Sequence, residues 1–369
     1  MRKNLIALAS ALLVAFTANA QDIQTGTVKV KGGTYTGTLF KGKPNGLGVA
    51  NYTNGDSYEG SFMKGKREGK GVYTFADGEK YDGQWTNDMQ NGQGTYYYSN
   101  NNRYVGLWFK DYKQGHGVMY YFNGDVYDGN WEKDRRNGKG KYTYRNGAYY
   151  NGEWVNDMKQ GSGLFDWGDG SKYSGHWMNN MRDGKGSYFY PDGDYYEGDW
   201  KADMQNGRGK YNFKNGDVYE GPYVNGERTG EGVINYANGN TYRGHFEKGE
   251  MEGQGTFKWK NQSVYTGMWH KSMRHGQGTY KWANGDEYIG QWKNGEMDGD
   301  GTLKEGTTRY KGKFKAGKRH GYGIEMYGDG TQYRGNFSNG ERDGSFVEYD
   351  KNGNVTAKGK YVNGKREVN

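Results

Sequence analysis

The chain has no cysteine and only three prolines among its 369 residues. The lack of cysteine excludes disulfide bonds, thiol nucleophiles and tethering through a lipid-modified cysteine. A mean hydropathy of −1.19 and a hydrophobic share of 32% would by themselves suggest disorder. However, disordered chains are usually richer in proline and poorer in rings, and 17% of these residues are aromatic. We therefore expect an ordered chain with an aromatic rather than an aliphatic core.

Long apolar runs are also lacking, except for one at the N-terminus. Two basic residues precede the apolar stretch 5–16, and Ala18 and Ala20 supply the small residues of a cleavage site. This pattern predicts a secretory signal peptide at 1–20, because the run is too short for a spanning helix. An uncleaved membrane anchor is the alternative. We expect an exported protein of bacterial type that is periplasmic, secreted or associated with the cell surface.

The chain also lacks a large excess of charge of one sign. Lysine and arginine number 51 and aspartate and glutamate 43, which gives a formal net charge of +8. This excess is mild for the length, so we expect no nucleic-acid partner.

The sequence does contain one repeated motif, which reads Tyr-x-Gly-x-Trp/Phe, then Gly-x-Gly, then Asn/Asp-Gly. The leading tyrosines are 23 residues apart, except for one spacing of 22 before Tyr310. A fixed period of this size predicts a stacked-repeat architecture in which no single compact core is needed. The leading tyrosines are Tyr35, Tyr58, Tyr81, Tyr104, Tyr127, Tyr150, Tyr173, Tyr196, Tyr219, Tyr242, Tyr265, Tyr288, Tyr310 and Tyr333.

Each repeat predicts one β-hairpin. With the leading tyrosine as position 0, the alternation of positions 0, 2 and 4 predicts a strand, and positions 11 to 17 predict a second strand. The fold class we predict is all-β, an elongated antiparallel β-meander or solenoid of about fourteen 23-residue β-hairpin repeats. We divide the chain into an N-terminal strand or cap at 21–34, the repeat array at 35–355 and a C-terminal partial repeat or cap at 356–369.

The hairpin model sets position 4 opposite position 11, position 2 opposite 13, and position 0 opposite 15. Glycines would then lie across from large rings and give each ring a bare backbone to lie on. We expect these rings to be structural: Tyr58, Tyr81, Trp85, Tyr104, Trp108, Tyr127, Trp131, Tyr150, Trp154, Tyr173, Trp177, Tyr196 and Trp200.

The two turns of the repeat carry different signals. Asn/Asp-Gly at positions 19 and 20 suits a two-residue type I′ turn, but that turn would place the next tyrosine on the opposite face. A three-residue turn ending in a left-handed glycine keeps all the rings on one side, so we predict that turn. At position 7, Gly, Asp and Asn interchange, which is typical of positive φ. We interpret those acids as turn formers rather than catalysts.

The segments 55–62 and 65–71 are close to the consensus of one family, and the chain resembles the MORN-repeat proteins over 35–355. The resemblance implies an elongated antiparallel β-meander used for binding and scaffolding. It also implies links to membrane apposition, acidic-phospholipid contact and self-association. Several middle repeats depart from the pattern, since Asp88-Met89 and Asp203-Met204 replace the usual Gly-Lys and weaken the case for lipid headgroups there.

No motif for catalysis emerges. The six histidines form no repeated ladder, and His270 and His275 lie near one turn without an evident third metal ligand. No serine lies in a Gly-x-Ser-x-Gly elbow, and the Gly-x-Gly pairs lie inside hairpins rather than before a helix. We expect no enzyme activity, no cofactor and no metal.

Two features suit binding. The first is a basic cluster in the thirteenth repeat, a candidate for anionic phospholipid or an envelope polyanion, or else a solvated lysine-rich edge. The cluster consists of Arg309, Lys311, Lys313, Lys315, Lys318 and Arg319. The second is the aromatic face, either buried core or a groove for sugars or a peptide.

The sequence thus predicts an exported, non-enzymatic binding scaffold at the cell envelope. Three hypotheses remain open. The scaffold could associate peripherally with anionic membrane lipid, bind a protein partner or itself as a homo-oligomer, or bind carbohydrate along an aromatic groove.

Overall fold

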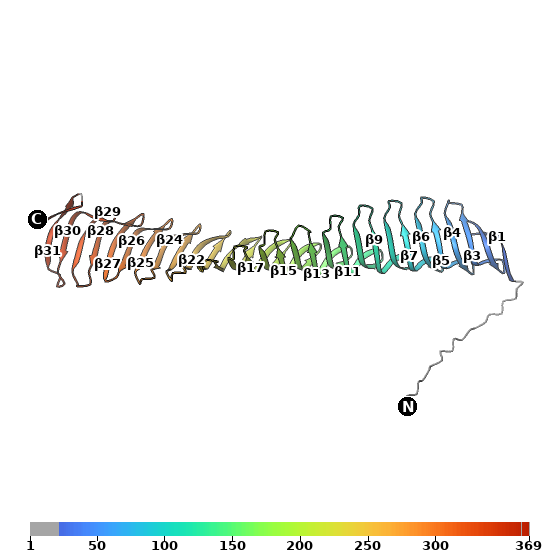
Figure 1. Ribbon diagram of the computed structural model, residues 1–369, viewed down its shortest axis with the longest axis horizontal. Coiled ribbons are helices and arrows are strands. Elements are labelled where there is room, and N and C mark those ends of the chain that lie inside the picture. The colour runs from blue at the N-terminus through green and yellow to red at the C-terminus, as the bar shows by residue number, and fades with distance from the viewer. Residues whose placement is uncertain (1–21, 363, 369) are drawn as a thin grey trace, which may run out of the picture. The chain divides into compact units, whose positions relative to one another are not determined.

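The computed structural model describes residues 22–362 and 364–368, so the expected signal peptide lies outside the described residues. The chain divides into two compact units, residues 1–160 (unit 1) and 161–369 (unit 2). Among the described residues of both units, every element is a β-strand (Figure 1). In the part of the chain that the structure describes, no helix is long and apolar enough to cross a membrane.

In unit 1 each strand pairs antiparallel with the next strand of the sequence, so the unit is an open meander. Its strands are β1 (Ile23–Val30), β2 (Gly33–Phe40), β3 (Lys43–Tyr52), β4 (Ser57–Met63), β5 (Lys66–Thr74), β6 (Lys80–Thr86), β7 (Met89–Tyr97), β8 (Arg103–Phe109), β9 (Tyr112–Tyr120), β10 (Val126–Glu132), β11 (Arg135–Thr143) and β12 (Tyr149–Val155). β13 (Met158–Asp166) begins in unit 1 and ends in unit 2.

Unit 2 is a second antiparallel meander of the same kind, as predicted for an all-β hairpin array. Its strands after β13 are β14 (Lys172–Met178), β15 (Met181–Phe189), β16 (Tyr195–Lys201), β17 (Met204–Asn212), β18 (Val218–Val224), β19 (Glu227–Arg228), β20 (Gly230–Asn235), β21 (Thr241–Glu247), β22 (Glu250–Lys258), β23 (Val264–His270), β24 (Met273–Lys281), β25 (Glu287–Lys293), β26 (Glu296–Glu305), β27 (Thr308–Lys315), β28 (Lys318–Met326), β29 (Gln332–Ser338), β30 (Glu341–Tyr349), β31 (Val355–Val362) and β32 (Lys365–Val368).

The leading tyrosines form the inner row of the core, and each lies across glycine. In the hairpin β4–β5, Tyr58 pairs with Tyr73 and Gly60 with Gly71, as predicted. A Cβ added to Gly71 would lie 2.2 Å from the Tyr58 hydroxyl, so only glycine leaves room for the ring. The hydroxyl donates a 3.1 Å hydrogen bond to the carbonyl of Ser61. Every leading tyrosine is 0% exposed.

The position-4 rings form a second row and lock neighbouring hairpins together. Trp85 packs edge-on against its own Tyr81 at 5.1 Å and against Tyr58 of the preceding repeat at 5.4 Å. Its Nε1–H donates to the carbonyl of Gly71, also in the preceding repeat, at 3.1 Å. The side chains at position 4 are only 2% to 7% exposed in all fourteen repeats. Burial of a tryptophan row therefore couples each hairpin to its neighbour.

The predicted pairing of position 4 with position 11 within one hairpin is wrong. Phe62 pairs with Arg67, and a β-bulge separates this pair from the glycine pair. Gly69, at position 11, instead lies opposite Trp85 of the next hairpin. Gly69 has a φ of +78°, and its missing side chain would point toward Ser61, away from the rings. Glycine is needed there because the bulge requires a positive φ, and not because a ring packs against it.

Both turn predictions are confirmed. After β5, the loop Ala76-Asp77-Gly78 has three residues, because Phe75 and Glu79 pair across it and Gly78 has a φ of 89°. At the other end, Asp88 has a φ of 70°, as position 7 requires. Position 6 also has positive φ, for example 50° at Asn87, so this turn is a two-residue type I′ turn.

Candidate functional site

The two faces of each meander differ sharply. The aromatic face carries the rings of positions 0 and 4, and the polar face lies opposite. In unit 1 the aromatic face contains a groove of about 550 Å³ along β5 to β9, which we call the aromatic-face groove. The rings of Phe75, Tyr96 and Tyr98 line it and are half-buried. They occupy positions 15 and 17, outside the fully buried rows.

These outer rings form a ladder along the groove. The centroids of successive rings are 4.7 Å apart from Tyr73 to Phe75, 5.9 Å from Phe75 to Tyr96 and 4.5 Å from Tyr96 to Tyr98. In unit 2 the same zigzag recurs, for instance from Trp259 to Tyr280 at 5.1 Å. The ladder gives the groove a row of flat apolar surfaces that recurs with the repeat.

Position 9 supplies a row of cations that the sequence analysis missed. The Arg67 guanidinium lies 4.2 Å from the Trp85 ring centroid and 4.8 Å from that of Tyr73. Its Nε is 3.4 Å from Oδ1 of Asp88, which also accepts the backbone N–H of Arg67 at 2.8 Å. Arginine recurs at position 9 in many repeats, so the periodicity would have revealed this row.

The position-7 aspartates therefore have a second role beyond the turn. Each accepts the backbone N–H of position 9 of the preceding repeat, as Asp157 does from Arg136 at 3.0 Å. The Arg136 guanidinium is 3.0 Å from the same carboxylate and stacks 4.4 Å from Trp154. Lys113 occupies position 9 in the fourth repeat, where burial lowers its pKa although Asp134 opposes that effect.

The outer-ring ladder of unit 2 ends after Trp282. The next repeat has Leu303 and Glu305 at positions 15 and 17, and the turn that follows them has two residues rather than three. A hollow of about 300 Å³ lies here on the aromatic face. Arg319 fills the gap, with its guanidinium 2.5 Å from both Glu305 and the buried Glu325. The groove thus changes from aromatic to charged at the thirteenth repeat.

This arrangement separates Arg319 from the basic cluster with which we grouped it, since it lies on the aromatic face, 5.0 Å from the Tyr310 ring centroid. Lys311, Lys313 and Lys315 are exposed and alternate with the buried Tyr310. They point to the polar face, as their odd positions indicate.

Two pairs of like charge face each other across strands in this cluster. Arg309 lies opposite Lys304, and Lys315 lies opposite Lys318. Of the lysines here, Lys313 has a carboxylate nearby, Asp300 at 4.0 Å. Like charges directly opposite destabilise a sheet, so the cluster favours an anion on this surface.

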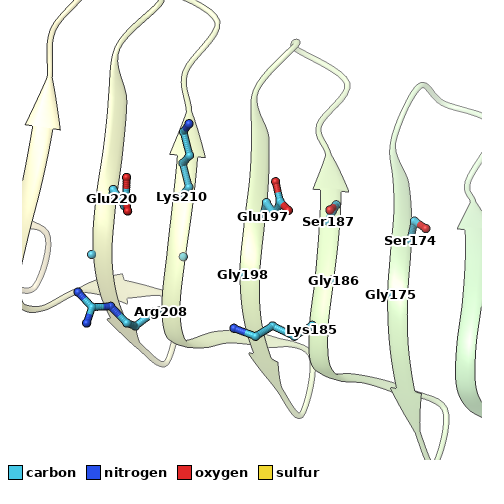
Figure 2. A pocket seen from close by; sticks show the side chains of 12 residues that line it. Ser174, Gly175, Lys185, Gly186, Ser187, Glu197, Gly198, Arg208, Lys210 and Glu220 are labelled. Carbon is cyan, nitrogen blue, oxygen red and sulfur yellow. The ribbon is translucent and has the colours of Figure 1, made fainter.

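A second hollow, of about 780 Å³, lies on the polar face of β14 to β18. Figure 2 shows Glu197, Lys210 and Glu220 in one row, and Lys185 and Arg208 in a second row nearer the other ends of the strands. Glycines separate the rows and leave the backbone bare. Because cations and carboxylates alternate, this hollow has no strong preference for a ligand of one sign.

The histidines do not converge. His270 Nδ1 lies 3.0 Å from Glu252 Oε1, and its ring centroid is 5.6 Å from that of His275. Over 22–362 and 364–368, no group of three or more His, Asp and Glu side chains could hold a metal ion.

Comparison with protein families gives one clear match. The model described as MORN repeat matches fourteen successive segments, which run from 35–57 to 333–355. No curated protein matches the chain.

Solved structures match only weakly. The SAS-4 TCP domain of Drosophila melanogaster, solved with a proline-rich motif of Ana2, is 17% identical and has a TM-score of 0.28, covering 42% of this chain and 84% of that one. The TCP10 domain of Danio rerio CPAP, in complex with a peptide of STIL, is 11% identical with a TM-score of 0.23, covering 80% and 96%.

Proposed function

This chain belongs to the MORN-repeat family, and we propose that it is an exported, non-enzymatic binding scaffold whose aromatic-face groove holds an extended polypeptide. The ligand would lie along the groove and cross the strands, in the polyproline II conformation. The single observation that carries the proposal is the ladder of half-buried rings that recurs with the hairpin repeat.

The spacing of the ladder selects the ligand conformation. Two strands separate equivalent rings, and at about 4.8 Å per strand the rings recur about every 9.6 Å. A polyproline II helix has three residues per turn and rises about 3.1 Å per residue, so its pitch is about 9.3 Å. The two-residue repeat of an extended strand is about 6.7 Å, and the pitch of an α-helix is about 5.4 Å. Polyproline II is therefore the backbone that presents an equivalent residue to each repeat.

The chemistry of the groove supports the same ligand. Pro-rich segments dock into grooves lined by aromatic rings, because their rigid backbone loses little entropy on binding. Their unpaired carbonyls can accept hydrogen bonds from position-9 side chains. Arg67, for example, uses Nη2 for the Asp88 carbonyl and Nε for the Asp88 carboxylate, which leaves Nη1 for a ligand. Rings and donors alternate along the groove, as the side chains and carbonyls of such a ligand do.

The test compares two phenylalanines of unit 1. Phe75 lines the groove, whereas Phe109 lies at the end of β8 and is 53% exposed. In a fluorescence-anisotropy titration with a labelled polyproline peptide, Phe75→Ala should weaken binding about tenfold, since one stacked ring contributes roughly 1–1.5 kcal/mol. Phe109→Ala should leave the affinity unchanged.

If the full-length mature protein binds oligosaccharides but no polyproline peptide, the groove is a carbohydrate site and the proposal is wrong. Equal losses for Phe75→Ala and Phe109→Ala would also contradict it, because the effect would then not map to the groove.

The basic cluster supports a second function, attachment to an anionic surface. Its like-charge pairs, Arg309 with Lys304 and Lys315 with Lys318, would be relieved by phosphate groups. We expect mature protein to float with vesicles rich in anionic phospholipid at low salt and to be released at high salt. Replacing Lys311, Lys313 and Lys315 together with alanine should abolish flotation, and an unchanged variant would exclude this surface.

A further inference from the structure

One repeat breaks the pairing of position 7 with position 9. Five repeats have aspartate at position 7, and four of these face a cation at position 9 of the preceding repeat, at 3.0 to 3.9 Å. The fifth is Asp111, which faces Gln90. The four regular pairs are Arg67–Asp88, Lys113–Asp134, Arg136–Asp157 and Arg182–Asp203.

The exception leaves the aromatic-face groove of unit 1 with an unbalanced charge. Asp88 and Asp134 line the groove together with their cations, Arg67 and Lys113. Asp111 lies between these two pairs and is exposed. Its Oδ1 accepts the backbone N–H of Gln90 at 2.7 Å, and no ion pair of Asp111 occurs among the described residues. The middle of the groove therefore carries one net negative charge.

Gln90 is the second feature of this place, because its side-chain amide has no protein partner among the described residues. The residue is 6% exposed and lines the groove, yet its side chain makes no hydrogen bond within the described ranges. The equivalent Gln205 of unit 2 donates to the hydroxyl of Tyr190 at 3.1 Å. At the corresponding place beside Gln90 the chain has Phe75, which has no hydroxyl. The Gln90 amide therefore keeps its hydrogen-bonding capacity for water or for a ligand in the groove.

We propose that Gln90 and Asp111 form a specificity site that takes a lysine or arginine side chain of the bound polypeptide. The ligand's cation would pair with the Asp111 carboxylate, and the Gln90 amide would bond the adjacent ligand backbone. Glutamine is shorter than arginine, so it leaves free the space that the Arg67 guanidinium fills beside Asp88. The inference rests on the proposed function and adds the class of ligand, a polyproline II segment with a basic residue.

The test uses two labelled peptides that differ in one charge. Both are polyproline, and the central residue is arginine in one and its neutral isostere citrulline in the other. Full-length mature protein should bind the arginine peptide about five to ten times more tightly, as expected for a partly exposed charge-assisted hydrogen bond. The preference should shrink as salt is added.

Two variants with the same change of charge locate the effect. In Asp111→Asn the preference for arginine should disappear, while Oδ1 can still accept the Gln90 N–H. In the matched control Asp88→Asn the preference should persist, because that carboxylate is already paired with Arg67. A third variant, Gln90→Arg, supplies the missing cation and should also abolish the preference.

The outcomes separate the two proposals. If the wild-type protein binds both peptides equally, or if Asp88→Asn loses the preference as Asp111→Asn does, the specificity site is wrong and the groove function stands. If neither peptide binds, both proposals are wrong.

Discussion

Replacing Gly71 with alanine should destabilise unit 1 by about 3 kcal/mol, the upper end for overpacking of a core. The new methyl carbon would lie 2.2 Å from the Tyr58 hydroxyl and 2.4 Å from its Cζ, and that ring is fully buried. The ring cannot move away, because Trp85 packs against it at 5.4 Å. We expect amide hydrogens of β4 to β6 to exchange much faster in Gly71→Ala, as measured by hydrogen exchange.

Gly26 provides the control in the same unit. A Cβ at Gly26 would meet only Leu39, at an ordinary 3.4 Å, and its φ is not positive. Gly26→Ala should therefore leave the exchange of β4 to β6 unchanged. Equal stability of Gly71→Ala and Gly26→Ala would show that the tyrosine rings do not require a bare backbone.

Alkali should unfold unit 2 steeply between pH 10 and pH 12. Burial raises the pKa of four of its leading tyrosines, Tyr219, Tyr265, Tyr310 and Tyr333, from 10.0 to about 12. Because the folded state binds these protons more tightly, their stabilisation is complete below the unfolded pKa and is lost as the pH rises through the folded pKa. Each such group loses about 1.4 kcal/mol per pH unit, so four lose about 5 kcal/mol per unit.

Over two pH units this loss reaches about 10 kcal/mol, which is comparable with the whole stability of a typical domain. We expect phenolate absorbance and the loss of the circular-dichroism signal of the sheet to occur together. If the phenolate signal developed fully near pH 10 while the sheet signal was retained, the leading tyrosines would not be buried as described.

Much of the fold could be predicted from the sequence, because the residues that recur at one position of the repeat show which conformation that position requires. The three-residue loop before Tyr81 could be predicted, since a two-residue turn within a 23-residue repeat would have put Tyr81 on the face opposite Tyr58. The positive φ at Asp88 followed from the exchange of Asp, Asn and Gly at position 7. The bulge at Gly69 could not be foreseen, because glycine suits both a strand against which a ring packs and a left-handed backbone conformation.

Less of the candidate site could be predicted. The sequence indicated an aromatic face, but the row of cations upon it depends on the bulge, which turns Arg67 toward Trp85. The same shift moved Arg319 out of the predicted basic cluster and onto the rings. The exposed Lys311 and Lys313 followed directly from strand alternation along β27, because the extra residues of the bulge lie on β28.

The match between the repeat and a polyproline II ligand can be tested most directly with a length series. Labelled polyproline peptides would be lengthened one residue at a time and titrated against the full-length protein, with anisotropy as the readout. Since each repeat accommodates about three ligand residues, the affinity should increase in steps at every third residue. A smooth increase with length, or no dependence on length, would contradict binding in register with the hairpins.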